Sequence, residues 1–374
     1  MTDVVVAGGG AIGLSIAWRA ARRGMSVTVV DPAPGRGATW AAAGLLAPVT
    51  ELHPGEERLL ELNLASAARY ESFVAELAAD ADRDVGFRRS GTLVVARDAD
   101  DNAALEDLYR LQVELGMDVE RLRGRDCRAL EPALAPRVRG GILVPGDHQV
   151  DNRALAGALL DACVRAGVDV RRERVDALET SGGRAAGVRT PDGGVEAGAV
   201  VLAAGAWSGA VAGVPAGALP PVRPVKGQLL QLRDVSGTPL AARNLRGVEC
   251  YVVPRADGRV VVGATVEERG FDDAVTAGAV FELLRAAYEL VPGVTELELV
   301  ETVAGLRPAT PDNGPAVGAT EVAGLVVATG HFRNGVLQAP ITAEAVCALL
   351  AGDEPPGEIA PFSPARFAPA EAAR

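Results

Sequence analysis

Three glycines and an aspartate near the N-terminus have the types and spacing needed to bind a dinucleotide. Gly8, Gly10 and Gly13 fit the pattern G-x-G-x-x-G, and Asp31 ends the next apolar segment. In this pattern the first glycine permits a tight turn, the second lets the backbone approach a pyrophosphate, and the third lets a helix pack on a strand. The acid accepts hydrogen bonds from the ribose hydroxyls. These residues predict a site for the phosphates and ribose of a dinucleotide.

The residues around this motif predict the elements that must position it. Residues 3–7 read as a buried strand, 11–24 as an Ala-rich helix and 26–31 as a second buried strand. A helix that begins near Ala11 directs its free N–H groups and its positive dipole end toward the phosphates. A glycine-rich turn in an ordinary α/β protein is the alternative. The strand, turn, helix, strand and acid together favour the dinucleotide site.

The rest of the chain predicts an α/β fold with two domains. Apolar strands at 200–204 and 325–330 also run into glycine turns, whereas strands at 224–232, 249–254 and 260–264 read as antiparallel. We expect a discontinuous Rossmann-like domain formed by 1–84, 142–215 and 302–353. An antiparallel-sheet α+β substrate domain then takes 85–141 and 216–301, and the Pro- and Ala-rich tail at 354–374 frays. The segment 305–312 reads as a loop, and 32–48 as a loop with a short helix.

Composition and charge exclude several classes of function. The formal charge of −12 disfavours a nucleic-acid partner or an anionic membrane. The four cysteines and three histidines have neither C-x-x-C nor H-x-x-x-H spacing, so we expect no disulfide framework and no metal. The N-terminus has no basic region followed by a long apolar run, and no apolar run spans a membrane. We therefore expect a soluble, cytoplasmic protein without a membrane partner, and a homo-oligomer.

A glycine segment late in the chain favours a flavin over a nicotinamide. The strand at 325–330 delivers Thr329 and Gly330 to the site, and a helix begins near Gly335. A helix N-terminus directed at the flavin pyrimidine ring stabilises the negative charge that reduction places there. A nicotinamide domain usually completes its ligand contacts earlier in the chain. The predicted dinucleotide is therefore FAD.

Four segments resemble the D-amino-acid oxidase superfamily of FAD enzymes and, within it, the glycine oxidase branch linked to thiamine thiazole synthesis. They are Gly8–Gly13 with Asp31, 39–48, 305–312 and 330–335, and the resemblance runs from residue 1 to about 350. It implies oxidation of glycine or another small amino acid, with O2 as the electron acceptor. No cysteine lies where related enzymes attach a flavin after Arg307, so we expect non-covalent FAD.

The resemblance also implies roles for individual residues. Arg307 would hold the substrate carboxylate, Tyr251 would support it, and Arg333 would be a second pocket arginine. The residues expected to bind FAD are Gly8, Gly10, Ile12, Gly13, Asp31, Pro32, Ala38, Thr39, Ala43, Gly44, Leu45, Val175, Gly205, His331, Phe332, Arg333, Asn334, Gly335, Val336 and Leu337. The chain departs from the family pattern at Glu249, Leu45 and Val266, where we expect a histidine and two methionines. These departures affect substrate preference.

Other interpretations of these residues remain open from the sequence alone. Arg307 and Arg333 could bind neighbouring carboxylates, Tyr251 could be a core residue, and His331 could be a structural cap. A sarcosine oxidase or a D-amino-acid dehydrogenase of the same superfamily is an alternative function. A nicotinamide-dependent dehydrogenase and a non-catalytic nucleotide-binding protein are more distant alternatives.

Overall fold

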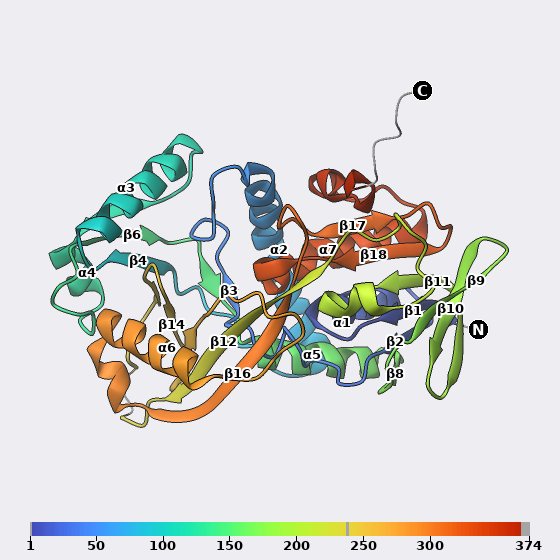
Figure 1. The fold of residues 1–374 in the computed structure, drawn as a ribbon, viewed down its shortest axis with the longest axis horizontal. Coiled ribbons are helices and arrows are strands. Elements are labelled where there is room, and N and C mark those ends of the chain that lie inside the picture. The colour runs from blue at the N-terminus through green and yellow to red at the C-terminus, as the bar shows by residue number, and fades with distance from the viewer. Residues whose placement is uncertain (1, 237–238, 368–374) are drawn as a thin grey trace.

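The computed structural model describes residues 2–236 and 239–367 and contains two large sheets side by side (Figure 1). The first sheet follows the order β17-β18-β11-β1-β2-β8, with the β9–β10 hairpin attached through β11. Its strands are β1 (Thr2–Ala7), β2 (Val27–Val30), β8 (Asp169–Arg171), β9 (Ala177–Ser181), β10 (Arg184–Thr190), β11 (Gly193–Leu202), β17 (Ala316–Ala319) and β18 (Leu325–Thr329). The central pairs β8–β2, β2–β1, β1–β11 and β11–β18 are parallel.

Helices cover one face of the first sheet, and antiparallel strands cover the other. The helices are α1 (Ala11–Arg22), α2 (Glu57–Ala81), α5 (Asn152–Arg165) and α7 (Gly335–Ala351). Val4 and Val6 of β1 pack with these helices, whereas Val5 packs with residues of β9, β10 and β11. Because successive side chains of a strand alternate between faces, an all-apolar strand is what a sheet covered on both faces requires. The predicted α/β fold is confirmed.

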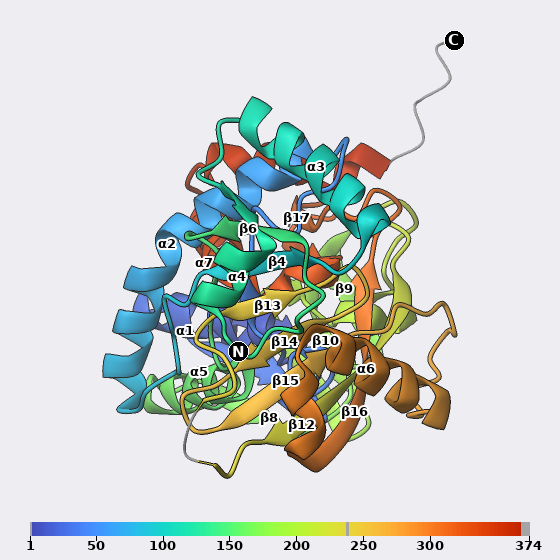
Figure 2. The ribbon, with the colours of Figure 1, turned by 90° about the vertical axis from the view of Figure 1, so that its left-hand side faces the viewer.

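The second sheet has the order β16-β12-β15-β14-β13-β4-β6-β5 and is antiparallel except between β4 and β13. Its strands are β4 (Thr92–Ala96), β5 (Glu120–Arg123), β6 (Gly140–Val144), β12 (Arg223–Arg233), β13 (Asn244–Arg246), β14 (Tyr251–Pro254), β15 (Arg259–Gly263) and β16 (Glu298–Ala309). Helices α3 (Ala99–Glu114), α4 (Gly124–Leu130) and α6 (Ala277–Leu290) pack around it, as Figure 2 shows. A short ribbon of β3 (Leu45–Leu46) and β7 (His148–Gln149) lies between the two sheets.

Several expectations about elements are wrong, and the cause is pairing with distant residues. The segment 305–309 continues strand β16, because residues 223–227 of β12 pair with it. Residues 142 and 302, where we expect domain boundaries, lie inside β6 and β16 of the second sheet. Residues 38–41 form turns in place of the expected short helix. The division into cofactor and substrate domains stays a prediction.

The C-terminal segment is packed up to the end of the described residues, contrary to the expected frayed tail. Two short 3-10 helices, Gly357–Phe362 and Pro364–Phe367, follow α7. Ile359 and Phe362 are buried in the core beside the helices, and Arg366 forms an ion pair with Asp312. Two large apolar side chains and one ion pair hold a segment whose prolines suggested disorder. Residues 368–374 of the expected tail lie outside the described part.

One helical stretch of the described residues, Phe332–Ala351, is long and apolar enough to cross a membrane. The helix α7 within it packs against α1 and α2, and 67% of its most apolar part is buried inside the fold. Burial on this scale is typical of a core helix.

Candidate active site

A cavity of about 840 Å³ brings together nearly all of the predicted site residues. It lies where the first sheet meets the second, and its lining comes from both. The predicted residues that line it are Gly8, Gly10, Ile12, Asp31, Pro32, Ala38, Thr39, Ala43, Gly44, Leu45, Val175, Gly205, Tyr251, Arg307, His331, Phe332, Arg333, Asn334, Gly335 and Val336. Gly13 and Leu337 do not line it. Gly13 packs against the turn beneath, and Leu337 is a buried core residue.

One end of the cavity, which we call the nucleotide end, is formed by the turn between β1 and α1. A Cβ atom at Gly8 would lie 2.3 Å from the carbonyl oxygen of Ala203, and one at Gly13 would lie 1.9 Å from that of Gly8. Only glycine fits at either position. The α1 N-terminus has no side-chain cap at Gly10, while the Ala11 N–H donates to the Thr39 hydroxyl at 2.9 Å. The close packing leaves the N-terminal turn of α1 facing the cavity.

Asp31 is oriented by two backbone groups at this end. Its carboxylate accepts hydrogen bonds from the Gly9 and Ala33 N–H groups, each at 2.7 Å. A carboxylate has about four acceptor sites, so Asp31 keeps capacity for ribose hydroxyls. Arg36, which the sequence interpretation missed, also lines the cavity and stacks on Trp40 at 3.7 Å. It has no ion-pair partner among the described residues, which leaves its charge available for a phosphate.

The N-terminus of α7 faces the same cavity further along. Asn334 and Gly335 line it, and the side-chain nitrogen Nδ2 of Asn334 is buried without a partner in the described part of the chain. A buried donor without a partner is costly unless a ligand accepts from it. The glycine turn, Asp31, Arg36 and this donor together fit a phosphate- and carbonyl-bearing cofactor such as FAD. All four cysteines are buried and none belongs to the cavity lining.

A second part of the cavity, which we call the arginine end, is lined by Glu51, Arg246, Tyr251, Arg307 and Arg333. Arg307 lies on β16, and its guanidinium donates to the backbone carbonyls of Thr265 at 3.1 Å and Lys226 at 3.4 Å. It forms no ion pair within the described residues. A Cβ at Gly227 would lie 2.3 Å from its Nη1 atom, so the guanidinium lies directly over that glycine. Arg307 is therefore a positioned and unneutralised cation.

Tyr251 on β14 lies near Arg307 and partly exposes its side chain to the cavity. Its register partner on β15 is Gly263, where a Cβ would lie 2.5 Å from the tyrosine hydroxyl. Burial raises the pKa of Tyr251, and the charge of Arg307 offsets part of that increase. The hydroxyl thus stays protonated at neutral pH and can donate a hydrogen bond to an anion beside Arg307.

Arg333 differs from Arg307 because its charge is already neutralised. Its Nε atom lies 3.1 Å from Oε2 of Glu51, and its Nη2 atom forms an ion pair with Glu56. Glu51 also forms an ion pair with Arg246 of β13, the register partner of Tyr251. Burial would raise the pKa of Glu51, but Arg246 and Arg333 outweigh it and hold the pKa below its usual value. Sequence reasoning missed Glu51 and Arg246, since neither belongs to a motif.

The departures from the family pattern have different structural outcomes. Glu249 does not line the cavity, and it forms ion pairs with Arg97 and Arg285 on the surface. Leu45 and Val266 do line it, and Val266 is 70% exposed at its rim. Of the three departures, only these two are placed to contact a ligand.

His331 is a neutral, buried side chain. Its Nε2 atom lies 3.0 Å from the Thr342 hydroxyl of α7, and burial lowers its pKa to about 3. The imidazole therefore stays neutral near neutral pH. Its contact with Thr342 anchors the Gly330–Gly335 segment on α7.

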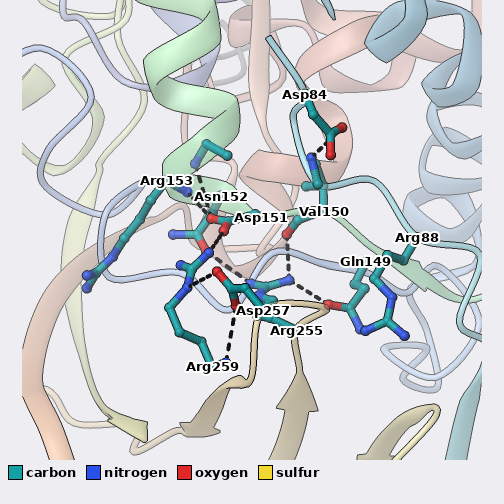
Figure 3. Close-up of polar contacts among 12 residues, drawn as sticks. Asp84, Arg88, Gln149, Val150, Asp151, Asn152, Arg153, Arg255, Asp257 and Arg259 are labelled. Atoms are coloured by element: carbon teal, nitrogen blue, oxygen red, sulfur yellow. Dashed lines mark hydrogen bonds and ion pairs between the residues drawn. The ribbon is translucent and has the colours of Figure 1, made fainter. Parts of the chain in front are cut away.

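Figure 3 shows the buried Arg255, which follows β14, with its hydrogen bonds to Gln149 and Val150. Arg255 donates to the carbonyls of Ala43 at 2.6 Å and Val150 at 2.8 Å, and to the Gln149 side chain at 2.7 Å. Burial lowers its pKa to about 10, and the charge of Asp151 opposes that effect. Because the Ala43 carbonyl belongs to a turn that lines the cavity, Arg255 holds that turn in place.

Comparison with known proteins agrees with this geometry. Residues 3–349 match the family described as FAD dependent oxidoreductase. The chain belongs to this family. The crystal structure of glycine oxidase from Geobacillus kaustophilus superimposes with a TM-score of 0.90 at 34% identity, covering 97% of this chain and 98% of that one. The resemblance and the FAD requirement expected from the sequence are confirmed.

Two curated relatives differ in their described roles. The bifunctional protein ThiO/ThiG of Synechocystis is 36% identical over 98% of this chain, which spans 54% of that protein's length. The hydrogen cyanide synthase subunit HcnC of Pseudomonas aeruginosa is 32% identical over 99% of this chain and 97% of its own. This chain is thus an FAD-dependent oxidoreductase of the glycine oxidase type, and its substrate needs a separate argument.

Proposed function

We propose that this enzyme oxidises glycine or another small amino acid at Cα, giving the imine, which water hydrolyses to the keto acid and ammonia. The observation that carries the proposal is Arg307, a cation without an ion-pair partner in the described chain, beside the hydroxyl of Tyr251. FAD, when bound, would supply the two-electron acceptor for the hydride from Cα, with O2, reduced to hydrogen peroxide, as the final acceptor.

The protein's own contribution in this proposal is positioning. A guanidinium binds a carboxylate through two parallel hydrogen bonds, which fixes both the position and the rotation of a small substrate. The contacts to the carbonyls of Thr265 and Lys226 hold the guanidinium in place before the substrate arrives. Such positioning can account for a large part of a rate enhancement without a catalytic base. None of the arginine-end side chains is required to remove a proton from Cα.

Replacing Arg307 tests the assignment. For Arg307→Leu we expect kcat/KM for glycine to fall by about 10²–10⁴-fold, because two charge-assisted hydrogen bonds of about 1.5–3 kcal/mol each are lost. Flavin absorbance should be retained, since Arg307 lies on β16 of the second sheet, whereas the glycine turn follows β1 of the first. Arg307→Lys keeps the positive charge but lacks the paired N–H donors of a guanidinium, so it should recover only part of the activity. Unchanged turnover and unchanged carboxylate binding in Arg307→Leu would contradict the proposal.

We also propose a role in thiamine thiazole synthesis, supported by similarity to ThiO/ThiG. Similarity to HcnC favours cyanide formation as the second candidate. Oxygen consumption with glycine, sarcosine and D-alanine, together with assays for peroxide, glyoxylate and cyanide, separates them. Peroxide and glyoxylate from glycine support the first role, cyanide supports the second, and reduction of a dye without peroxide indicates a dehydrogenase.

A further inference from the structure

We infer that Glu51 is a specificity-determining residue that restricts the cavity to substrates with a single carboxylate. This inference rests on the proposed function and names the substrate class of the same site. It begins from three guanidinium groups at the arginine end, which belong to Arg246, Arg307 and Arg333. Three cations around one small ligand would otherwise favour a polyanion.

Two carboxylates remove that preference. Glu51 bridges Arg246 and Arg333, and Glu56 binds Arg333 from the other side. The side chains of Glu51, Glu56 and Arg333 are each exposed by only 15–16% of their surface, so water screens these ion pairs weakly. With Arg246 and Arg333 neutralised by two acids, Arg307 supplies the one remaining positive charge. One unpaired guanidinium matches one carboxylate.

The place of Glu51 explains why its charge matters to the ligand. Arg246 is the register partner of Tyr251, whose hydroxyl feels the charges of Arg307, Glu51 and Arg246. In the order of the second sheet, β14 with Tyr251 lies between β16 with the unpaired Arg307 and β13 with the neutralised Arg246. A ligand held by Arg307 that carried a second carboxylate toward Arg246 would meet the Glu51 carboxylate there. Like charges in a weakly screened site repel strongly, which disfavours a dicarboxylate.

The orientation of Glu51 is itself fixed by a buried acid. Both carboxylate oxygens of Asp147 accept hydrogen bonds from the turn before Glu51, from Val49 N–H at 3.1 Å and Thr50 N–H at 2.7 Å. The Glu51 backbone carbonyl in turn accepts from Arg333 at 3.2 Å. These contacts hold the main chain at Glu51 in place, and the ion pairs with Arg246 and Arg333 then hold its side chain.

The test compares matched ligands that differ by one carboxylate. Sarcosine and iminodiacetate share the same amine, and methoxyacetate and diglycolate are their oxygen analogues, which have no amine to oxidise. In the wild-type holoenzyme we expect methoxyacetate to bind at least about tenfold more tightly than diglycolate by calorimetry. Equal affinity for the two would overturn the inference. This measurement needs no turnover, so it decides the inference even if no amine is oxidised and the proposed function fails.

Glu51→Gln removes the negative charge at nearly constant volume. We expect the ratio of kcat/KM for iminodiacetate over sarcosine to rise at least about tenfold, with a parallel change in the diglycolate to methoxyacetate affinities. Glu249→Gln, which removes an acid from a surface network outside the cavity, should leave the ratio unchanged. A ratio in Glu51→Gln within twofold of the wild type would overturn the inference.

A double variant tests whether Arg246 is the cation that Glu51 masks. Adding Arg246→Gln to Glu51→Gln removes both partners of the ion pair, so the ratio should return toward the wild-type value. A ratio that stays high would show that another group recruits the second carboxylate, and would overturn the assignment. Flavin content and melting temperature of each variant establish that it is folded. If neither variant retains FAD, the wild-type comparison of methoxyacetate with diglycolate decides alone.

Discussion

At the nucleotide end of the cavity, the groups that face the ligand are mostly backbone atoms of the segment from Gly8 to Ala11, joined by Asp31 and Arg36. At the arginine end they are the charged side chains of Glu51, of Arg246 on β13, of Arg307 on β16 and of Arg333 before α7, together with the neutral hydroxyl of Tyr251 on β14. Ligand binding at the nucleotide end depends on glycines, which have no side chain. Ligand binding at the arginine end depends on which arginines are neutralised by ion pairs. A substitution should therefore act through shape at one end and through charge or position at the other.

The largest expected effect comes from adding a methyl group under the nucleotide end. In Gly13→Ala the new Cβ would lie 1.9 Å from the Gly8 carbonyl oxygen, so α1 must move away from β1. We expect destabilisation by about 1–3 kcal/mol and loss of FAD during gel filtration. Flavin-to-protein absorbance and denaturant unfolding measure both. Gly278→Ala in α6 is the control, because no atom lies within 4 Å of its new Cβ. Its free energy of unfolding should rise by about 0.5–1 kcal/mol. Full flavin content in Gly13→Ala would show that the close packing is not needed.

A smaller effect is expected from the same chemical change at the arginine end. In Gly227→Ala the Cβ would lie 2.3 Å from Nη1 of Arg307 and must displace the guanidinium. We expect KM for the amino acid to rise by about 10–100-fold, because an error of about 1 Å in position can cost that much. FAD content should not change. Gly247→Ala, with no neighbour nearer than 3.7 Å, is the matched control. Loss of FAD with unchanged KM would contradict the separation of the two ends.

The smallest effect on ligand binding at neutral pH concerns Asp147, which holds the turn that precedes Glu51 and whose titration acts on stability. Burial raises its pKa to about 6, above the value of 3.8 for an exposed aspartate. Above pH 6 the folded protein must keep a buried carboxylate ionised, and this cost disappears as the pH falls from 6 toward 3.8. The amide introduced by Asp147→Asn cannot titrate. As the pH is lowered from 7.5 to 4, the free energy of unfolding of the wild type should therefore rise by about 2–3 kcal/mol relative to that of this variant. Urea unfolding at several pH values measures the difference, and a constant difference would contradict the raised pKa.

The two ends of the cavity also differ in how much of each could be predicted from the sequence. The glycine turn and Asp31 were found because a short stretch of chain forms them, so their spacing is visible in the sequence. Arg307 was found by family resemblance, but its segment was expected to be a loop. Gly305 and Pro308 suggested a turn, whereas pairing with β12 makes it a strand. Glu51 and Arg246 were missed because their partners are distant in sequence, and no local pattern records an ion pair of this kind.

The sequence by itself determined the alternation of strands and helices, the dinucleotide turn, the family and the requirement for FAD. The alternation and the turn follow from apolar periodicity and glycine spacing, which act between neighbours along the chain, whereas the family and FAD follow from the resemblance of four segments and from the late glycine segment. Only the tertiary structure decided which of the three arginines remains without an ion pair and how the C-terminal segment packs. Both features depend on contacts between segments that are distant in sequence and that the fold brings together. For the arginines, the acids around each guanidinium set the charge that is available to a ligand.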